Sequence, residues 1–153
     1  LLKKVGAKIK VAEKQIHILG PKKIKNINNL VTKEYPNFPT DLQAQFMVLL
    51  CKAKGKSSIT ESIFENRFMH VAELRRLGAE ISIKKNKAFI SGNTNFQAAE
   101  LMSSDLRASV ALVLAAIVAK GSSIINRIYH LDRGYENIEN KLRKVGVNIR
   151  RVN

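Results

Sequence analysis

The stretch SDLRASVALVLAAIVAK, residues 104–120, decides the fold because it predicts a helix that is apolar on every side. Between residues 108 and 119 the only polar side chain is Ser109. The run is too short for a bilayer, which needs roughly 20 apolar residues, so we expect surrounding protein to bury it. Ser104 fits the N-cap position, and Asp105 suits the positive end of the helix.

Arg107 does not fit this pattern, because a cation in the first turn opposes the helix dipole. Two explanations are open from the sequence. Arg107 either pairs with Asp105 or another carboxylate, or it is placed there for function, since functional residues often violate local preferences.

Length and composition limit the other possibilities. The 153 residues, 45% of them hydrophobic, suffice for about one domain with a core. The single cysteine, Cys51, excludes a disulfide framework and predicts a reducing, cytoplasmic compartment. We identify no signal peptide or transmembrane run. The net charge of +15 raises the question of nucleic-acid binding, but the lysines are scattered, as on a solvated surface.

An internal repeat organises the chain. The segments LLKKVGAKI (1–9), ELRRLGAEI (73–81) and KLRKVGVNI (141–149) recur at intervals of about 70 residues. Each copy is typical of the basic last turn of a helix, followed by a glycine and then a strand. We expect three units: residues 1–20, the end of a first unit; residues 21–92, a second unit; and residues 93–153, a third unit truncated before its last strand. The chain is therefore expected to be part of a longer protein.

The second unit is predicted to have the order βαβαββ. The predicted elements are strands 24–32, 58–63, 80–83 and 88–91, an extended connector 35–39, a helix opened by a capping box at 40–43 and running to about 54, and a helix 66–77 capped by Asn66. The third unit repeats this order with strand 97–102, helix 105–120, strand 122–128, helix 135–145 and a strand from Val147. Because the first helix of both units is markedly apolar, we predict an α/β fold with helices inside and sheets outside.

Four motifs carry a resemblance to a known family: FPTDLQAQF (38–46), IFENRFMH (63–70), SDLRAS (104–109) and RIYHLDRGYE (127–136). They resemble the UDP-N-acetylglucosamine 1-carboxyvinyltransferases, enolpyruvyl transferases of the first committed step of peptidoglycan synthesis. The resemblance implies an inside-out α/β barrel (alpha-beta prism) of three βαβαββ units in each of two domains. This chain resembles most of the second domain, so its partner would be the missing N-terminal domain.

The resemblance also implies a reaction. Enolpyruvate moves from phosphoenolpyruvate to the 3′-hydroxyl of UDP-N-acetylglucosamine, phosphate is released, and neither a metal nor an organic cofactor takes part. Asp41 would lie at the sugar hydroxyl as the proposed base, where a first helical turn favours an ionised carboxylate. Ile63 and Phe64 would meet the nucleotide sugar. From the residues alone, the simpler interpretation of Asp41 is a helix-start aspartate, and that of Ile63 an ordinary strand residue.

Three arginines match those that face phosphoenolpyruvate in the family: Arg67, Arg107 and Arg133. Guanidinium groups grip carboxylate and phosphate through paired donors. The alternative for each arginine is a surface ion pair. Arg67 and Arg133 are both expected just past the middle strand of their unit, at the start of its second helix.

The remaining candidates and alternatives are weaker. His70 and His130 lack metal-ligand spacing and are interpreted as structural, and Cys51 as an inert core thiol. The family's reactive cysteine belongs to the other domain, so the chain alone is expected to be inactive. A 3-phosphoshikimate 1-carboxyvinyltransferase-like enzyme and a basic nucleic-acid-binding module stay open as alternatives. The preferred hypothesis includes no nucleic-acid and no membrane partner.

Overall fold

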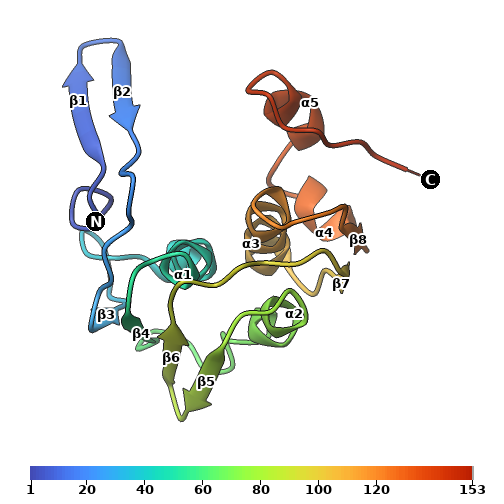
Figure 1. The fold of residues 1–153 in the computed structure, drawn as a ribbon. Helices are drawn as coiled ribbons and strands as arrows, with labels where there is room; N and C mark the ends of the chain where they lie inside the picture. Colours follow the sequence, from blue (N-terminus) through green and yellow to red (C-terminus); the bar gives the residue numbers. More distant parts are fainter. Residues whose placement is uncertain (153) are drawn as a thin grey trace.

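The computed structural model describes residues 1–152 and places helices inside an incomplete ring of strands, as Figure 1 shows. Helix α3 (Leu106–Ile117) packs against both α1 (Gln43–Cys51) and α2 (His70–Arg76). The sheets lie outside these three helices (Figure 1). The predicted α/β architecture, with helices inside and sheets outside, is confirmed.

The second unit forms the main sheet. Its strands are β3 (Leu30–Val31), β4 (Lys56–Thr60), β5 (Ile81–Lys84) and β6 (Lys87–Ser91), and their spatial order is β3-β4-β6-β5. The strands β3 and β4 are parallel, whereas β6 is antiparallel to both of its neighbours. Helix α1 connects β3 to β4 and α2 connects β4 to β5, which confirms the order βαβαββ.

The other elements flank this unit. A hairpin of β1 (Lys8–Ala12) and β2 (Gln15–Leu19) precedes it and projects away from the helices (Figure 1). The third unit contains β7 (Glu100–Met102), α3, β8 (Ile124–Asn126), α4 (Tyr129–Asp132) and α5 (Ile138–Arg143), with β7 parallel to β8. Within residues 1–152, none of the helices has the length and hydropathy needed to cross a membrane.

Most of α3 is buried, but one side of it is not. The residues 108–113 and Ala115 are all buried, and Leu112 is 1% exposed. Leu114 and Ile117, by contrast, are each 37% exposed. The expectation that this helix is buried on every side is therefore wrong for the described residues, because no element among them covers this side.

The repeated glycines end helical turns as predicted. Gly6, Gly78 and Gly146 all have positive φ, at 106°, 95° and 92°. At the second copy the Gly78 N–H donates to the Arg75 carbonyl (2.9 Å) and the next N–H donates to the Leu74 carbonyl (3.0 Å). Equivalent bonds form at the other two copies. Glycine suits the position because a Cβ disfavours the left-handed conformation.

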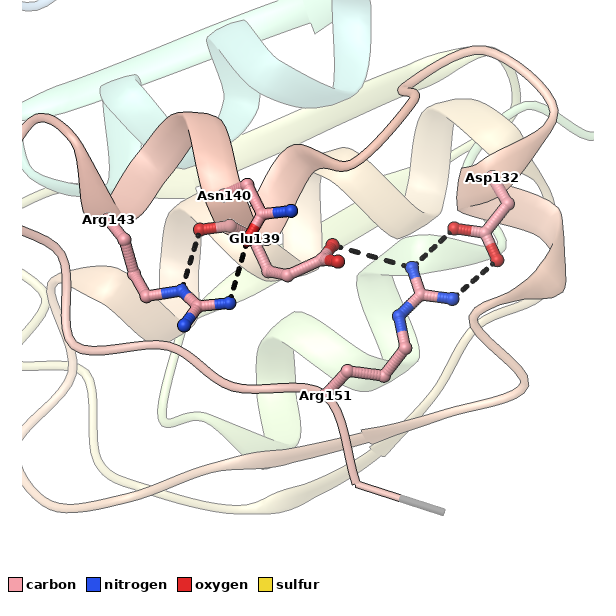
Figure 2. A network of polar contacts seen from close by, with 5 residues as sticks. All are labelled: Asp132, Glu139, Asn140, Arg143 and Arg151. Carbon is pink, nitrogen blue, oxygen red and sulfur yellow. Dashed lines mark hydrogen bonds and ion pairs between the residues drawn. The ribbon is translucent and has the colours of Figure 1, made fainter.

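The strand predicted from Val147 is wrong. The residues 147–152 pair with no strand, whereas Asn153 lies outside the described residues. The guanidinium of Arg151 instead donates to both carboxylate oxygens of Asp132, at 2.9 and 2.6 Å, and to Glu139 at 3.4 Å (Figure 2). Side-chain contacts with the α4–α5 region therefore replace a strand ladder here.

The helix starts differ from the predicted caps. Asp105, not Ser104, caps α3, because its Oδ1 accepts the N–H groups of Arg107 (2.9 Å) and Ala108 (3.0 Å). Asn66 caps nothing: its φ is +54°, and α2 begins four residues later at His70.

The predicted capping box at 40–43 is also wrong. Residues Thr40–Leu42 form a 3₁₀ turn that leads into α1 without a side-chain cap. The Thr40 hydroxyl is not available to the helix start because it donates to the carboxylate of Glu61 at 2.9 Å. Helix α1 ends at Cys51, three residues earlier than expected.

The segment 24–32 is a strand only at Leu30–Val31, apart from an isolated bridge between Lys25 and Lys54. Between these points a backbone hydrogen bond from the Ser58 N–H to the Ile27 carbonyl (3.1 Å) is supplemented by polar side chains. The Ile27 N–H donates to the Ser57 hydroxyl at 3.2 Å, and the Ser58 hydroxyl donates to a backbone carbonyl of the segment. The predicted extended connector 35–39 is mostly a turn, closed by a hydrogen bond from the Asn37 N–H to the Glu34 carbonyl. The predicted helix 135–145 is shorter (α5), and α4 was not predicted.

Candidate functional site

A pocket of about 320 Å³ lies where three segments meet. They are the start of α1, the turn before α2 and the start of α3. The pocket is lined by Thr40, Gln43, Ala44, Glu65, Asn66, Arg67, Met69, His70, Asp105, Arg107 and Ala108. Because α1 and α3 both begin here, their positive ends favour anionic groups in the pocket.

Asp41 does not line this pocket itself, but its carboxylate contacts Arg107, which does. The Arg107 Nε lies 2.5 Å from Asp41 Oδ1, although the two residues are 66 positions apart in the chain. Arg107 therefore has a carboxylate partner, but the partner is not Asp105. The two side chains are 37% and 61% exposed, and such pairs contribute about 0–1 kcal/mol to stability. A ligand can therefore replace either partner at small cost.

Arg67 and Phe64 form a second contact at the site. The Arg67 guanidinium lies 4.4 Å from the centre of the Phe64 ring, a cation–π geometry, and Arg67 lines the pocket. The backbone N–H groups of Ile63 and Phe64 donate to Glu61 Oε1 at 3.0 and 3.3 Å. The predicted nucleotide-sugar residues thus adjoin one of the predicted arginines.

Glu61 is a residue that our sequence reasoning missed. Its side chain is 2% exposed and accepts four hydrogen bonds, yet it forms no ion pair within residues 1–152. A glutamate that follows the strand segment KSSIT is usually solvated, so nothing in the local pattern indicated burial. Only the tertiary contacts identify it.

Arg133 is not among the residues that line the pocket. It lies at the C-terminal end of α4, not at the start of a helix as predicted, and its side chain is exposed. The preceding residue, Asp132, is held by Arg151 (Figure 2), and this hydrogen-bonded guanidinium lowers the pKa of the Asp132 carboxyl. The described structure thus unites Asp41, Arg67 and Arg107 but leaves Arg133 apart.

His70 and Gln43 are buried polar residues that line the pocket. Their side chains are 3% and 2% exposed, and within residues 1–152 neither His70 Nε2 nor Gln43 Nε2 has a hydrogen-bond partner. Burial lowers the pKa of His70 to about 4, and the nearby Asp105 carboxylate opposes this only in part. His70 is therefore neutral at pH 7.

This pKa predicts a pH-dependent stability. The unfolded chain binds a proton at His70 below about pH 6.5, whereas the folded chain does so only near pH 4. The free energy of unfolding should therefore fall as the pH is lowered from 7 toward 4, by up to about 3 kcal/mol from this group. Urea unfolding at several pH values measures the slope. His70→Gln should flatten it relative to wild type.

The control is His17→Gln, because His17 lies on the exposed hairpin. This variant should retain the wild-type slope. Equal slopes for wild type and His70→Gln between pH 7 and 5 would contradict a buried, neutral His70.

Cys51 offers no activated nucleophile. The side chain is fully buried, and burial raises the pKa of its thiol to about 12, partly offset by a hydrogen bond with Thr94. A thiol with that pKa is almost entirely protonated at neutral pH. Among the described residues 1–152, no group of three or more His, Cys, Asp or Glu side chains could hold a metal ion.

Comparison with known proteins gives a consistent result. Residues 1–142 match the family described as EPSP synthase (3-phosphoshikimate 1-carboxyvinyltransferase). The chain is 67% identical over 153 residues to the UDP-N-acetylglucosamine 1-carboxyvinyltransferase of Pelagibacter ubique, covering 100% of this chain and 36% of that protein. It is 54% identical over 151 residues to the enzyme of the same name from Desulfosudis oleivorans, covering 99% and 36%. The chain thus spans about a third of the length of these relatives.

Solved structures share the fold. The enolpyruvyl transferase NikO from Streptomyces tendae superimposes with a TM-score of 0.89 at 26% identity, covering 97% of this chain and 34% of that one. An EPSP synthase from Acinetobacter baumannii superimposes with a TM-score of 0.80 at 18% identity, covering 99% and 38%.

Proposed function

Because the chain belongs to the EPSP synthase (3-phosphoshikimate 1-carboxyvinyltransferase) family, we propose that it is part of an enolpyruvyl transferase whose acceptor is UDP-N-acetylglucosamine. The donor is phosphoenolpyruvate, and phosphate is released. The observation that carries this proposal is the 67% identity with the Pelagibacter enzyme over the whole of this chain. The pocket supports it, since a carboxylate and two arginines line or adjoin one cavity.

Each residue has a role in this proposal. Asp41 accepts the proton of the sugar 3′-hydroxyl as the hydroxyl oxygen adds to the phosphate-bearing carbon of phosphoenolpyruvate. An acid outside this chain protonates the methylene carbon. The resulting tetrahedral ketal then loses phosphate and the added proton. Arg67, Arg107 and Arg133 hold the carboxylate and phosphate of phosphoenolpyruvate. Ile63 and Phe64 contact the nucleotide sugar.

Arg107 changes partner in this scheme. In this structure it pairs with Asp41. An incoming carboxylate or phosphate offers the guanidinium a bidentate partner, which frees Asp41 to meet the sugar hydroxyl. The exposure of the Asp41–Arg107 pair supports this exchange, since little stability is lost when the pair opens.

Arg133 and the reactive cysteine of the family require the rest of the enzyme in this proposal. Arg133 lies outside the pocket in this chain, and we propose that it joins the site when a second domain closes over it. We also propose that the unit boundaries are 1–20, 21–92 and 93–153.

The alternative acceptor, 3-phosphoshikimate, receives less support. The chain is 54–67% identical to the two amino-sugar enzymes but only 18% identical to the superimposed EPSP synthase. Nucleic-acid binding is supported only by the net charge of +15.

The proposal predicts that activity depends on context. We define the Pelagibacter chimera as the Pelagibacter ubique relative in which residues 1–153 replace the matching segment. The chimera should release phosphate from phosphoenolpyruvate only when UDP-N-acetylglucosamine is present. The 153-residue chain alone should stay at background, because it spans 36% of that relative. An inactive chimera beside an active parent enzyme, or clear turnover by the chain alone, would contradict this prediction.

A further inference from the structure

We propose that Glu61 is the positioning residue of the site, a buried carboxylate that fixes the sugar-binding loop and the start of α1 relative to each other. Residue Asp41 and residues 63–64 then keep the spacing that the nucleotide sugar requires. The assignment of those residues to the sugar rests on the proposed function, whereas the geometry of Glu61 does not.

The four hydrogen bonds of Glu61 come from three segments. Oε1 accepts the Thr32 hydroxyl at 2.8 Å and the N–H groups of Ile63 and Phe64 at 3.0 and 3.3 Å. Oε2 accepts the Thr40 hydroxyl at 2.9 Å. The carboxylate therefore joins the end of β3, the start of α1 and the loop after β4.

The backbone of Glu61 is fixed as well. Its N–H donates to the Asn86 carbonyl at 2.8 Å, and its own carbonyl accepts the Asn86 side-chain amide at 2.9 Å. Asn86 lies in the turn between β5 and β6, so the strand end that carries Glu61 is anchored to the main sheet. Because both the backbone and the carboxylate of Glu61 are hydrogen-bonded, the residue holds the groups that donate to its carboxylate in fixed positions.

These partners are the neighbours of the candidate functional groups. Thr40 precedes Asp41, whose carboxylate meets Arg107. Phe64 carries the ring on which Arg67 rests. One buried side chain, which does not itself line the pocket, thus connects the segment that carries Asp41 to the loop that carries Phe64.

The donors decide which substitution preserves the geometry. The N–H groups of Ile63 and Phe64 can only donate, so the atom at the Oε1 position must accept. The Thr40 hydroxyl can donate or accept. Glu61→Gln can therefore satisfy every bond, with its oxygen toward the loop and its amide toward Thr40. Glu61→Ala leaves the buried donors without a partner.

The test compares these variants in the Pelagibacter chimera. Glu61→Ala should raise the KM for UDP-N-acetylglucosamine by about tenfold or more. The reason is that buried N–H and hydroxyl groups left without a partner disfavour the binding geometry of the loop by about that factor. The KM for phosphoenolpyruvate should change much less. Glu61→Gln should stay within about threefold of the unsubstituted chimera. Either an unchanged sugar KM in folded Glu61→Ala, or Glu61→Gln as impaired as Glu61→Ala, overturns the proposal.

A second pair of variants covers the case in which Glu61→Ala does not fold. Thr40→Val removes the hydroxyl that bonds Oε2, whereas Thr40→Ser keeps it. Thr40→Val should raise the KM for UDP-N-acetylglucosamine, whereas Thr40→Ser should leave it close to that of the unsubstituted chimera. The matched control is Thr60→Val, since the Thr60 hydroxyl donates to Asn29 at 3.2 Å, outside the Glu61 contacts. Equal effects of Thr40→Val and Thr60→Val would overturn the proposal.

A spectroscopic measurement on the 153-residue chain separates this proposal from the proposed function. The amide proton resonances of Ile63 and Phe64 report their bonds to Glu61 whether or not the enzyme assignment holds. They should stay in place in Glu61→Gln and move upfield in Glu61→Ala. If they do so while the chimera transfers no enolpyruvate, the proposed function fails and the positioning role stands. If they do not move in Glu61→Ala, the positioning role fails.

Discussion

Asp41→Asn in the Pelagibacter chimera should lower the turnover number by about 10²–10⁴-fold, the usual contribution of a general base. The substitution keeps the shape of the side chain and removes the basic oxygen and the charge. Folding should be unaffected, because Asp41 is exposed, makes no cap bond in the 3₁₀ turn Thr40–Leu42 and belongs to a weak ion pair. Steady-state phosphate release and thermal unfolding measure the two effects separately.

The matched control for Asp41 is Glu34→Gln, which removes an exposed carboxylate at the turn before α1. Its turnover should remain that of the chimera. Turnover of Asp41→Asn within a few-fold of the chimera would reduce Asp41 to a residue that only pairs with Arg107.

Arg107→Ala should weaken phosphoenolpyruvate binding by about 2–5 kcal/mol, the usual cost of truncating a charge-assisted contact in a site. This corresponds to a rise in KM of roughly 30-fold to several thousandfold. Arg107→Lys keeps the charge but loses the planar fork, so its effect should be smaller yet clear. The KM values for both substrates are measured in the chimera.

The control for Arg107 is Arg76→Ala. Arg76 is an exposed arginine of α2 whose nearest carboxylate contact, with Glu73, is 3.9 Å long. It should leave both KM values unchanged. If Arg107→Ala changes the two KM values equally and slightly, Arg107 only forms a surface ion pair and does not bind the anionic groups of phosphoenolpyruvate.

The sequence was sufficient for the parts of the fold that local rules determine. The three repeated glycines predicted three helix ends because a left-handed residue after a helix strongly favours glycine. The alternation on either side of residues 84–87 predicted the β5–β6 hairpin, and the apolar run 108–119 predicted a central helix.

The parts that failed depend on competition between partners distant in sequence. Thr40 matched a capping box, but a glutamate 21 residues away takes its hydroxyl. Ser104 was the predicted N-cap, but Asp105 has the extended backbone of the cap residue, and its side chain accepts the first N–H groups of α3. Likewise, no local pattern indicated that Arg107 would meet Asp41, 66 residues away in the chain.

The β1–β2 hairpin implies that this chain opens in stages. Its strands pair only with each other among the described residues, and Val11 and Leu19 are 75% and 64% exposed. A lone two-stranded hairpin is marginally stable in water. Its amide hydrogens should therefore exchange with solvent deuterium through frequent local opening. The amides of β4, the strand that carries the fully buried Ile59, should exchange only when the whole chain unfolds.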